Sequence, residues 1–298
     1  MTQSAIQTAI SADTRAATHT IRLRRALRRQ YLLRTARAIG RSLTNAVISL
    51  VVVVMLWIGS LWVFQVTPYI GKGPLDVWEV LVSDAAAAEN RELIGAALAQ
   101  TLYDASIGFS AGLFVAILVA VVFSLFTAAE HALMPIAMLL RSVPLVAMAP
   151  IIILVFGREQ ASVAVMGAIV VLFPALVNIV FGLRSASPQM LDLIAVYGGN
   201  RWTALRKVAM PASLPAFFAA IKISVPGAIT GALLVEWLAT GQGVGYGIIS
   251  AVGRAKTNEV WAYVVVITIV SILLYNLVAL VESFVLSRFG QDAGRSSA

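Results

Sequence analysis

Four charged side chains are singled out within long apolar stretches of this sequence, where an ionised group is costly unless it is paired, faces water or binds a polar ligand. They are Asp104, Arg141, Lys222 and Glu236. Each is therefore a candidate for lining a pathway taken by a polar solute. Each also has a structural alternative, because the two cations could reach lipid headgroups along their alkyl chains and the two acids could pair or cap within a helix bundle.

The residue inventory offers little for catalysis or for metal binding. The sequence has no cysteine and only two histidines, His19 and His131, which excludes thiolate chemistry and leaves too few ligands for a histidine metal cluster. Lys72 lacks the glycine spacing and the following Ser or Thr of a nucleotide-binding P-loop. We therefore expect no cofactor and no enzyme activity, and any ATP hydrolysis must come from another chain.

Composition predicts a membrane protein built from helices. Hydrophobic residues make up 60% of the sequence and charged residues 12%, where a soluble domain carries about a quarter charged residues. The mean hydropathy is +0.90. Several apolar runs approach the roughly 20 residues that cross a bilayer as a helix, so we expect an all-α, polytopic fold. The net charge of +8 then reflects topology and attraction to anionic lipid rather than nucleic-acid binding.

About six transmembrane helices are expected. They cover residues 44–64, 95–126, 134–156, 161–181, 216–238 and 260–286. Six spans place both termini on one side of the membrane. The predicted organisation is an arginine-rich segment at 1–43, a transmembrane domain at 44–290 and a short tail at 291–298.

The distribution of basic residues predicts which side that is. Residues 1–43 hold nine arginines and one acid, the 65–92 segment is mainly acidic, and the 182–215 loop holds four basic residues against one acid. The positive-inside bias therefore places both termini and the 182–215 loop in the cytoplasm. Within the first region, residues 21–41 are interpreted as an interfacial amphipathic helix, with an organelle transit peptide as the alternative.

Glycine patterns give two further expectations. Gly108 with Gly112, and Gly227 with Gly231, are small-xxx-small pairs inside spans, which predicts close helix packing within the chain. The glycines of residues 241–247 do not follow the spacing of a dinucleotide-binding loop, so we expect a flexible outer loop there.

The loop between the fourth and fifth spans holds a spaced pattern. Asp192 is followed six residues later by Gly198, and Pro211 comes thirteen residues after that glycine, with Val208 between them. We expect two short helices separated near Gly198 and Gly199, because glycine tolerates the positive φ that often ends a helix.

In this register the loop resembles the cytoplasmic signature of ABC importer permeases, which reads Glu-Ala-Ala, three residues, Gly, nine residues, Ile, one residue, Leu-Pro. Leu193 and Ile194 replace the two alanines, and Met210 replaces the leucine. The resemblance implies that the first short helix docks into a groove of a separate ATPase. An ordinary solvated helical hairpin is the alternative.

The residues expected to couple the loop to an ATPase share this loop. They are Asp192, Ala195, Tyr197, Gly198, Gly199, Val208 and Pro211. Leu191, Ile194, Ala195 and Tyr197 are expected to form the apolar face of the first short helix.

The resemblance covers about residues 95–286 and is closest to permeases for sulfonates, taurine, nitrate and pyrimidine precursors. It rests on the segments Leu140 to Pro150, Ala220 to Ile223, Val235 to Leu238 and Gly241 to Tyr246. One departure concerns Asp104, which stands where that group usually has arginine. If Asp104 lines the pathway, it disfavours a permanently anionic solute.

The resemblance implies a type I permease fold and a function as the membrane subunit of an ATP-driven importer in a prokaryotic inner (plasma) membrane. The implied partners are ABC ATPase subunits inside, a solute-binding protein outside and a second permease copy, with a homodimer or a heterodimer both open. An ion-coupled secondary transporter or channel without an ATPase is the alternative function. The transported solute cannot be read from the sequence.

Overall fold

The computed structural model of this chain describes residues 48–289, and every regular element in that range is a helix. The segments predicted as an interfacial helix (1–43) and as a tail (291–298) lie outside the described residues. The chain divides between Pro74 and Leu75 into two compact units, which are considered separately.

The first unit contains the apolar helix Ile48–Val63. Its end is closed by backbone hydrogen bonds from Phe64 to Ser60 and from Val66 to Leu61, each 3.0 Å long. The first expected span is thus helical from residue 48 onward, and residues 44–47 of that prediction lie outside the described range.

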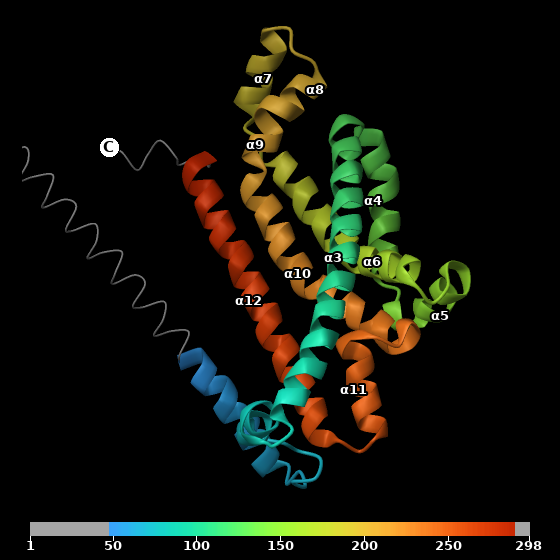
Figure 1. Ribbon diagram of the computed structural model, residues 1–298. Helices are drawn as coiled ribbons and strands as arrows, with labels where there is room; N and C mark the ends of the chain where they lie inside the picture. Colours follow the sequence, from blue (N-terminus) through green and yellow to red (C-terminus); the bar gives the residue numbers. More distant parts are fainter. Residues whose placement is uncertain (1–47, 290–298) are drawn as a thin grey trace, which may run out of the picture. The chain divides into compact units, whose positions relative to one another are not determined.

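The second unit is a bundle of helices (Figure 1). Its elements are α2 (Pro74–Trp78), η1 (Glu79–Ser83), α3 (Ala87–Leu125), α4 (Thr127–Arg141), α5 (Leu145–Phe156), α6 (Gln160–Arg184), α7 (Pro188–Val196), α8 (Arg201–Ala204), η2 (Leu205–Ala209), α9 (Met210–Ala212), α10 (Leu214–Val235), η3 (Glu236–Thr240), α11 (Gly243–Gly253) and α12 (Thr257–Phe289). The three η elements are π-helices that continue the α-helices next to them.

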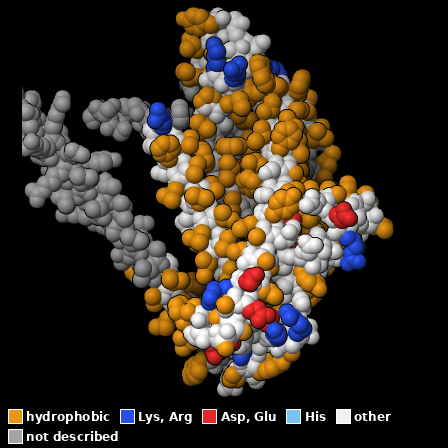
Figure 2. Space-filling view, viewed as in Figure 1, with side chains coloured by type: hydrophobic (Ala, Val, Ile, Leu, Met, Phe, Trp, Pro, Cys, Tyr) orange, Lys and Arg blue, Asp and Glu red, His pale blue; other side chains and the backbone are white. Residues whose placement is uncertain are grey.

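Four described helices are long and apolar enough to cross a membrane: α3, α6, α10 continued through η3, and α12. The pair α4 and α5 adds a fifth crossing if the two are counted as one bent span. On the face seen in Figure 2, hydrophobic side chains predominate along the long helices, with backbone and uncharged side chains between them. Such a surface is expected of a protein whose helices face lipid rather than water. The all-helical, multi-span prediction is confirmed.

Glycines bring the central helices together. A Cβ on Gly108 of α3 would lie 2.7 Å from the Cα of Gly167 in α6, and one on Gly231 of α10 would lie 3.1 Å from the same atom. A Cβ on Gly112 would lie 2.7 Å from the backbone oxygen of Ala168. Side chains larger than hydrogen would force these helices apart, so the small residues are packed within the chain as predicted.

The expected span 134–156 is not one straight helix. Two helices occupy this region, and α5 is bent away from α4 by 101°. Proline explains the break, because Pro144 has no backbone N–H and restricts Val143 before it to extended conformations. Pro144 itself is extended, with ψ of 123°. α4 also begins earlier than expected, at Thr127, so Arg141 lies at the far end of a 15-residue helix.

The flexible outer loop predicted for residues 241–247 is wrong, because α11 begins at Gly243. Gly243, Val244 and Gly245 are buried, so the start of α11 is packed into the bundle. Figure 1 shows α11 at one end of this unit and the short helices α7 and α8 at the other.

Candidate functional site

An apolar face of α7 is left uncovered at the α7–α8 end of the bundle. Met190, Leu193 and Tyr197 follow the i, i+3, i+7 spacing of one helix face, and Val196 adjoins them. These four side chains are 50, 47, 84 and 82% exposed, in that order. A short helix at the tip of a hairpin gains nothing from exposing four large apolar groups to water, so this face is a candidate docking surface.

The exposed face differs in part from the one predicted. Leu191 and Ile194 are only partly exposed, and the turn that follows α7 lies against Ile194. A Cβ on Gly199, for example, would lie 2.5 Å from Cγ2 of Ile194. Ala195 and Tyr197 are exposed as expected. The sequence holds a signal for this difference. Gly198 and Gly199 end the helix, and the chain then turns back against Ile194.

Gly198 and Gly199 end α7 in the predicted way, each for its own reason. Gly198 has φ of +75°, the left-handed conformation that glycine adopts without steric cost. Its N–H donates to the oxygen of Ala195 at 3.0 Å, and the N–H of Gly199 donates to the oxygen of Ile194 at 2.8 Å. This pair of bonds is the Schellman arrangement. Asn200 then caps α8 by accepting from the N–H of Thr203 at 2.9 Å.

The remaining loop residues singled out from the sequence are spread along the hairpin. Asp192 is exposed on α7, Val208 is half-buried in η2, and Pro211 lies in the first turn of α9. Pro211 also borders an apolar groove of about 590 Å³ with Arg206 at its rim. The structure therefore brings Ala195, Tyr197 and the two glycines to the tip of the hairpin, while Val208 and Pro211 lead back into the bundle.

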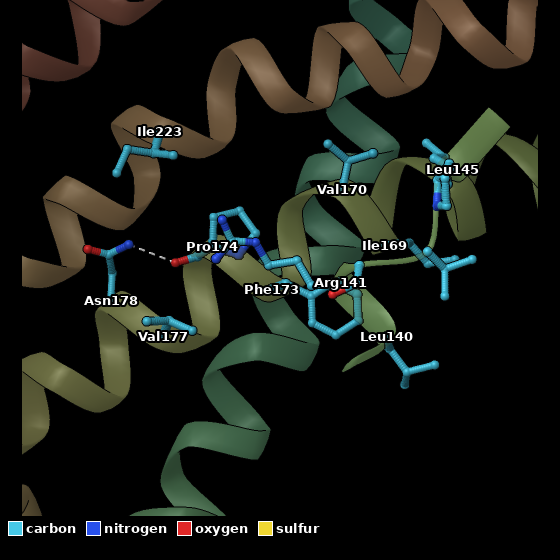
Figure 3. A pocket seen from close by; sticks show the side chains of 13 residues that line it. Leu140, Arg141, Leu145, Ile169, Val170, Phe173, Pro174, Val177, Asn178 and Ile223 are labelled. Carbon is cyan, nitrogen blue, oxygen red and sulfur yellow. Dashed lines mark hydrogen bonds between the residues drawn. The ribbon is translucent and has the colours of Figure 1, made fainter. Parts of the chain in front are cut away.

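A second candidate site is a cavity of about 590 Å³ at the break between α4 and α5 (Figure 3). Its walls come from the 140–145 segment, from α6 and from α10. The lining side chains are Leu140, Arg141, Ser142, Val143, Pro144, Leu145, Ile169, Val170, Phe173, Pro174, Val177, Asn178 and Ile223. An irregular backbone at the depth of a membrane is tolerated where it lines a cavity or is buried in protein.

Three polar side chains line this cavity, and two of them, Arg141 and Asn178, keep groups for a solute. The hydroxyl of the third, Ser142, donates to the oxygen of Met138 at 3.3 Å. Arg141 makes no hydrogen bond or ion pair with a described side chain and lies among the cavity-lining residues in Figure 3. Asn178 donates its amide N–H to the oxygen of Pro174 at 2.8 Å, which leaves its amide oxygen available as an acceptor. A cation, an amide oxygen and an apolar wall that includes Phe173 can hold a small solute with polar and apolar parts.

Glu236 has a structural role at the start of α11. Its Oε2 accepts the N–H of Gly245 at 2.7 Å and the hydroxyl of Thr101 at 3.0 Å, and the hydroxyl oxygen accepts the N–H of Val244 at 2.8 Å. Glu236 and Thr101 therefore satisfy two of the N–H groups that every helix leaves unpaired at its start. The glycines are needed for this contact, because a Cβ on Gly243 would lie 2.2 Å from the carboxyl carbon of Glu236.

Asp104 is buried near this cap and is only 2% exposed. Its Oδ1 accepts the amide N–H of Gln100 at 3.0 Å, and its Oδ2 has no hydrogen-bond partner among the described residues. Asp104 thus faces the inside of the bundle, and the cavity at the α4–α5 break is lined by other residues.

Lys222 is paired rather than free. Its Nζ lies 2.5 Å from Oε2 of Glu282, and both side chains are about one-fifth exposed. This ion pair joins α10 to α12. Glu282 was not among the charges singled out from the sequence, although it also lies within an expected span, 260–286. What the sequence does not show is that Lys222 and Glu282, so far apart in the chain, meet. The sequence reasoning also missed Asn178 and Phe173, which carry no charge to mark them within α6.

The comparisons with known proteins agree with these features. The family described as "Binding-protein-dependent transport system inner membrane component" matches residues 108–289. The chain is 29% identical over 224 residues to a "Probable ABC transporter permease protein" of Haemophilus influenzae, covering 75% of this chain and 89% of that protein.

Two further relatives have transport names. The chain is 33% identical over 153 residues to the riboflavin transport system permease protein RibX of Chloroflexus aurantiacus, covering 51% of this chain and 57% of that protein. It is 28% identical over 189 residues to the formylaminopyrimidine transport permease protein ThiX of Halalkalibacterium halodurans, covering 63% of this chain and 76% of that protein.

Proposed function

This chain belongs to the family of binding-protein-dependent transport system inner membrane components, and from that premise we propose that it forms half of the translocation pathway of an ATP-driven importer. A second permease copy supplies the other half. ABC ATPase subunits bind at the α7–α8 end, and a solute-binding protein delivers the solute at the opposite face. The subunit itself hydrolyses nothing, and ATP is bound by its partners.

The exposed apolar face of α7 carries this proposal. It consists of Met190, Leu193, Val196 and Tyr197 on a rigid helix whose end is fixed by Gly198. A rigid helix with uncovered apolar side chains suits a partner that pushes on it, since the movement of one protein then reaches the other without being absorbed by a flexible loop. The expected coupling residues Asp192, Ala195, Gly199, Val208 and Pro211 belong to the same hairpin.

The cavity at the α4–α5 break is the proposed solute site. A broken span places backbone polar groups and the side chain of Arg141 at a depth where a continuous helix would present only apolar side chains. The volume of about 590 Å³ suits a small organic solute. Of the charges first considered as pathway residues, Arg141 is the one that we retain, because Asp104 and Glu236 are buried and Lys222 is paired.

The proposed orientation follows from charge. The segment from α7 to α9 carries Arg201, Arg206 and Lys207. We place this segment and both termini on the cytoplasmic side of the inner membrane of a prokaryote. Because the sequence has no cysteine, this can be tested with single cysteines. A thiol reagent that does not cross membranes should label Ala85→Cys in intact cells and Gln189→Cys only after permeabilisation. The reverse pattern would overturn both the orientation and the function.

The docking surface is tested by co-purification. Val196→Asp and Tyr197→Asp place a charge on the apolar face and should release the ATPase from the solubilised complex, while membrane insertion stays normal. Val252→Asp is the matched control, because Val252 is a similarly exposed apolar side chain, 59% exposed, on α11 at the other end of the bundle. If all three variants retain the ATPase equally, α7 is not the docking helix.

The alternative function is an ion-coupled secondary transporter or a channel. It predicts that no ATP-hydrolysing partner accompanies the wild-type chain in any mild detergent, and that solute flux follows an ion gradient. Retention of an ATPase that is lost specifically with the α7 variants excludes this alternative.

A further inference from the structure

The corner between α3 and α4 is held by two arginines that flank α7 in the sequence. Nη1 of Arg201, in α8, donates to the backbone oxygen of Leu125 at 3.0 Å. Nη2 of Arg184, at the end of α6, lies 2.5 Å from Oε1 of Glu130 in the first turn of α4. The hairpin of α7 and α8, which we propose binds the ATPase, is therefore flanked by two residues that both contact the corner between α3 and α4.

Both contacts use groups that need a partner. Leu125 is the last residue of α3, so its carbonyl oxygen has no N–H ahead of it in that helix. The Glu130 side chain is 8% exposed, while that of Arg184 is 59% exposed. A carboxylate buried to this extent requires a cation or several donors, and Arg184 supplies the cation from the solvent side.

α4 is attached to the rest of the bundle chiefly at this point. Glu130 is the only residue of α4 that is buried. Leu133, Ile136 and Leu139 further along the helix are 48, 52 and 71% exposed. A helix with a single buried side chain can turn about that point more easily than one packed throughout.

The far end of α4 reaches the cavity at the α4–α5 break, where the chain continues into α5. Arg141 is the last residue of the helix, and it lines the cavity. From Glu130 to Arg141 the helix advances about 16 Å at about 1.5 Å per residue. A small rotation at Glu130 is thus converted into a larger displacement of Arg141.

We propose that Arg184 and Arg201 are positioning residues that pass movement of the α7–α8 hairpin to α4, and through α4 to Arg141 in the solute cavity. The inference rests on the proposed function, since it assumes that an ATPase moves the hairpin. Nucleotide-driven closure of the ATPase shifts α7, the two arginines carry the α3–α4 corner with it, and the cavity changes its accessibility.

The test uses the cavity itself as the reporter. Ser142 lines the cavity and the chain has no native cysteine, so Ser142→Cys is a unique thiol beside Arg141. The complex is isolated from its native membranes with the co-purifying ATPase. Labelling by a small maleimide is then compared without nucleotide and after trapping with ATP and vanadate. A several-fold change in labelling rate is expected for the otherwise unaltered chain.

In the Ser142→Cys background, Arg201→Gln and Arg184→Gln should abolish most of this nucleotide-dependent change while the ATPase stays bound. Arg201→Lys and Arg184→Lys keep a cationic donor and should restore it, which a merely structural loss would not do. Lys207→Gln is the matched control, because Lys207, in η2 directly after α8, is an exposed basic residue without an ion pair to a described residue. It should behave like the unaltered chain.

Arg184→Gln alone leaves a buried carboxylate unpaired and could lower expression. The double variant Arg184→Gln with Glu130→Gln removes both charges and keeps the side-chain shapes, so it should fold and still lose the labelling change. The inference is overturned if the glutamine variants, including this double variant, respond to ATP and vanadate as fully as Lys207→Gln does. If the chain with Ser142→Cys alone neither retains an ATPase nor responds, the proposed function itself fails.

Discussion

The backbone at Gly198 is left-handed, with φ of +75°, and a Cβ there would meet nothing within 4 Å. The penalty for alanine is therefore conformational alone, about 1–2 kcal/mol. Because this residue ends α7, Gly198→Ala should misplace the docking face and weaken ATPase binding by up to about thirtyfold, with normal membrane insertion. Gly198→Asn should be milder, since asparagine tolerates this conformation better.

Gly95 is the control for this series. It lies within α3, and a Cβ there also meets nothing within 4 Å, but its backbone is helical. Gly95→Ala should leave ATPase binding unchanged. Equal retention of the ATPase by Gly198→Ala and Gly95→Ala would show that the end of α7 does not set the docking geometry.

Gly241 and Gly243 separate backbone strain from steric conflict. Both have positive φ, +68° and +80°, but a Cβ meets nothing at Gly241 and overlaps the carboxylate of Glu236 at Gly243. Gly241→Ala should cost about 1 kcal/mol. Gly243→Ala should cost about 2 kcal/mol more, because Glu236 must give up the N–H of Gly245. Thermal unfolding in detergent measures both, and equal shifts would contradict the proposed cap.

Between elements, the ion pair of Lys222 with Glu282 joins α10 to α12. Lys222→Met or Glu282→Leu alone leaves a charge without its partner inside a span, which should destabilise the chain by about 2 kcal/mol. The double variant should be closer to the unaltered chain than the sum of the singles, because no unpaired charge remains. A double-mutant cycle of thermal unfolding measures the coupling.

The pair of Lys256 with Glu259 is the control for that cycle, because Lys256 is open to solvent and Glu259 keeps a second partner, Arg254, when Lys256 is replaced. Lys256 is 52% exposed, so its Coulomb attraction to Glu259 is screened by water. Lys256→Met should change stability by less than about 1 kcal/mol. A coupling between Lys222 and Glu282 no larger than this would mean that the α10–α12 contact depends on packing alone.

Hydropathy predicts some of the helices from the sequence and misses others. Long apolar runs predict α3, α6, α10 and α12, because hydropathy alone decides whether a helix can lie in lipid. The same runs concealed the break between α4 and α5, since both pieces are apolar and hydropathy does not register a change of direction. Pro144 was the available signal. The start of α11 was hidden because its N–H partners, Thr101 and Glu236, belong to other elements.

The candidate sites also include features that the local sequence predicts and features that it does not. The Gly198 turn was predictable, because a positive φ beside a short helix is a local property of glycine. The roles of the charged residues were not, because whether a charge is paired or free depends on residues far away in the sequence. Lys222 meets Glu282, Asp104 meets Gln100, and Arg141 is left facing the cavity.

For the molecule as a whole, we expect one copy of the chain to supply only one side of the proposed pathway. The cavity at the α4–α5 break is bordered by α5, whose Ile151, Leu154 and Val155 are 65, 85 and 66% exposed. A cavity that holds a polar solute must be closed off from lipid, because an unpaired polar group in hydrocarbon costs several kcal/mol. A second copy seated on α5 would provide that closure, so we expect the α5 face to be the interface between copies.

The α5 interface is tested with single cysteines in the cysteine-free chain. A cysteine near the two-fold axis meets its own copy, and a disulfide forms only when the two Cβ atoms approach to about 4 Å. Oxidation should therefore produce dimers for at least one of Ile151→Cys, Leu154→Cys and Val155→Cys in native membranes. On α12, Leu273, Leu277 and Leu280 are also exposed, at 61, 55 and 69%, and their cysteine variants should stay monomeric because this face meets lipid. Cross-linking on α12 with none on α5 would move the interface to α12 and leave the cavity without its second wall.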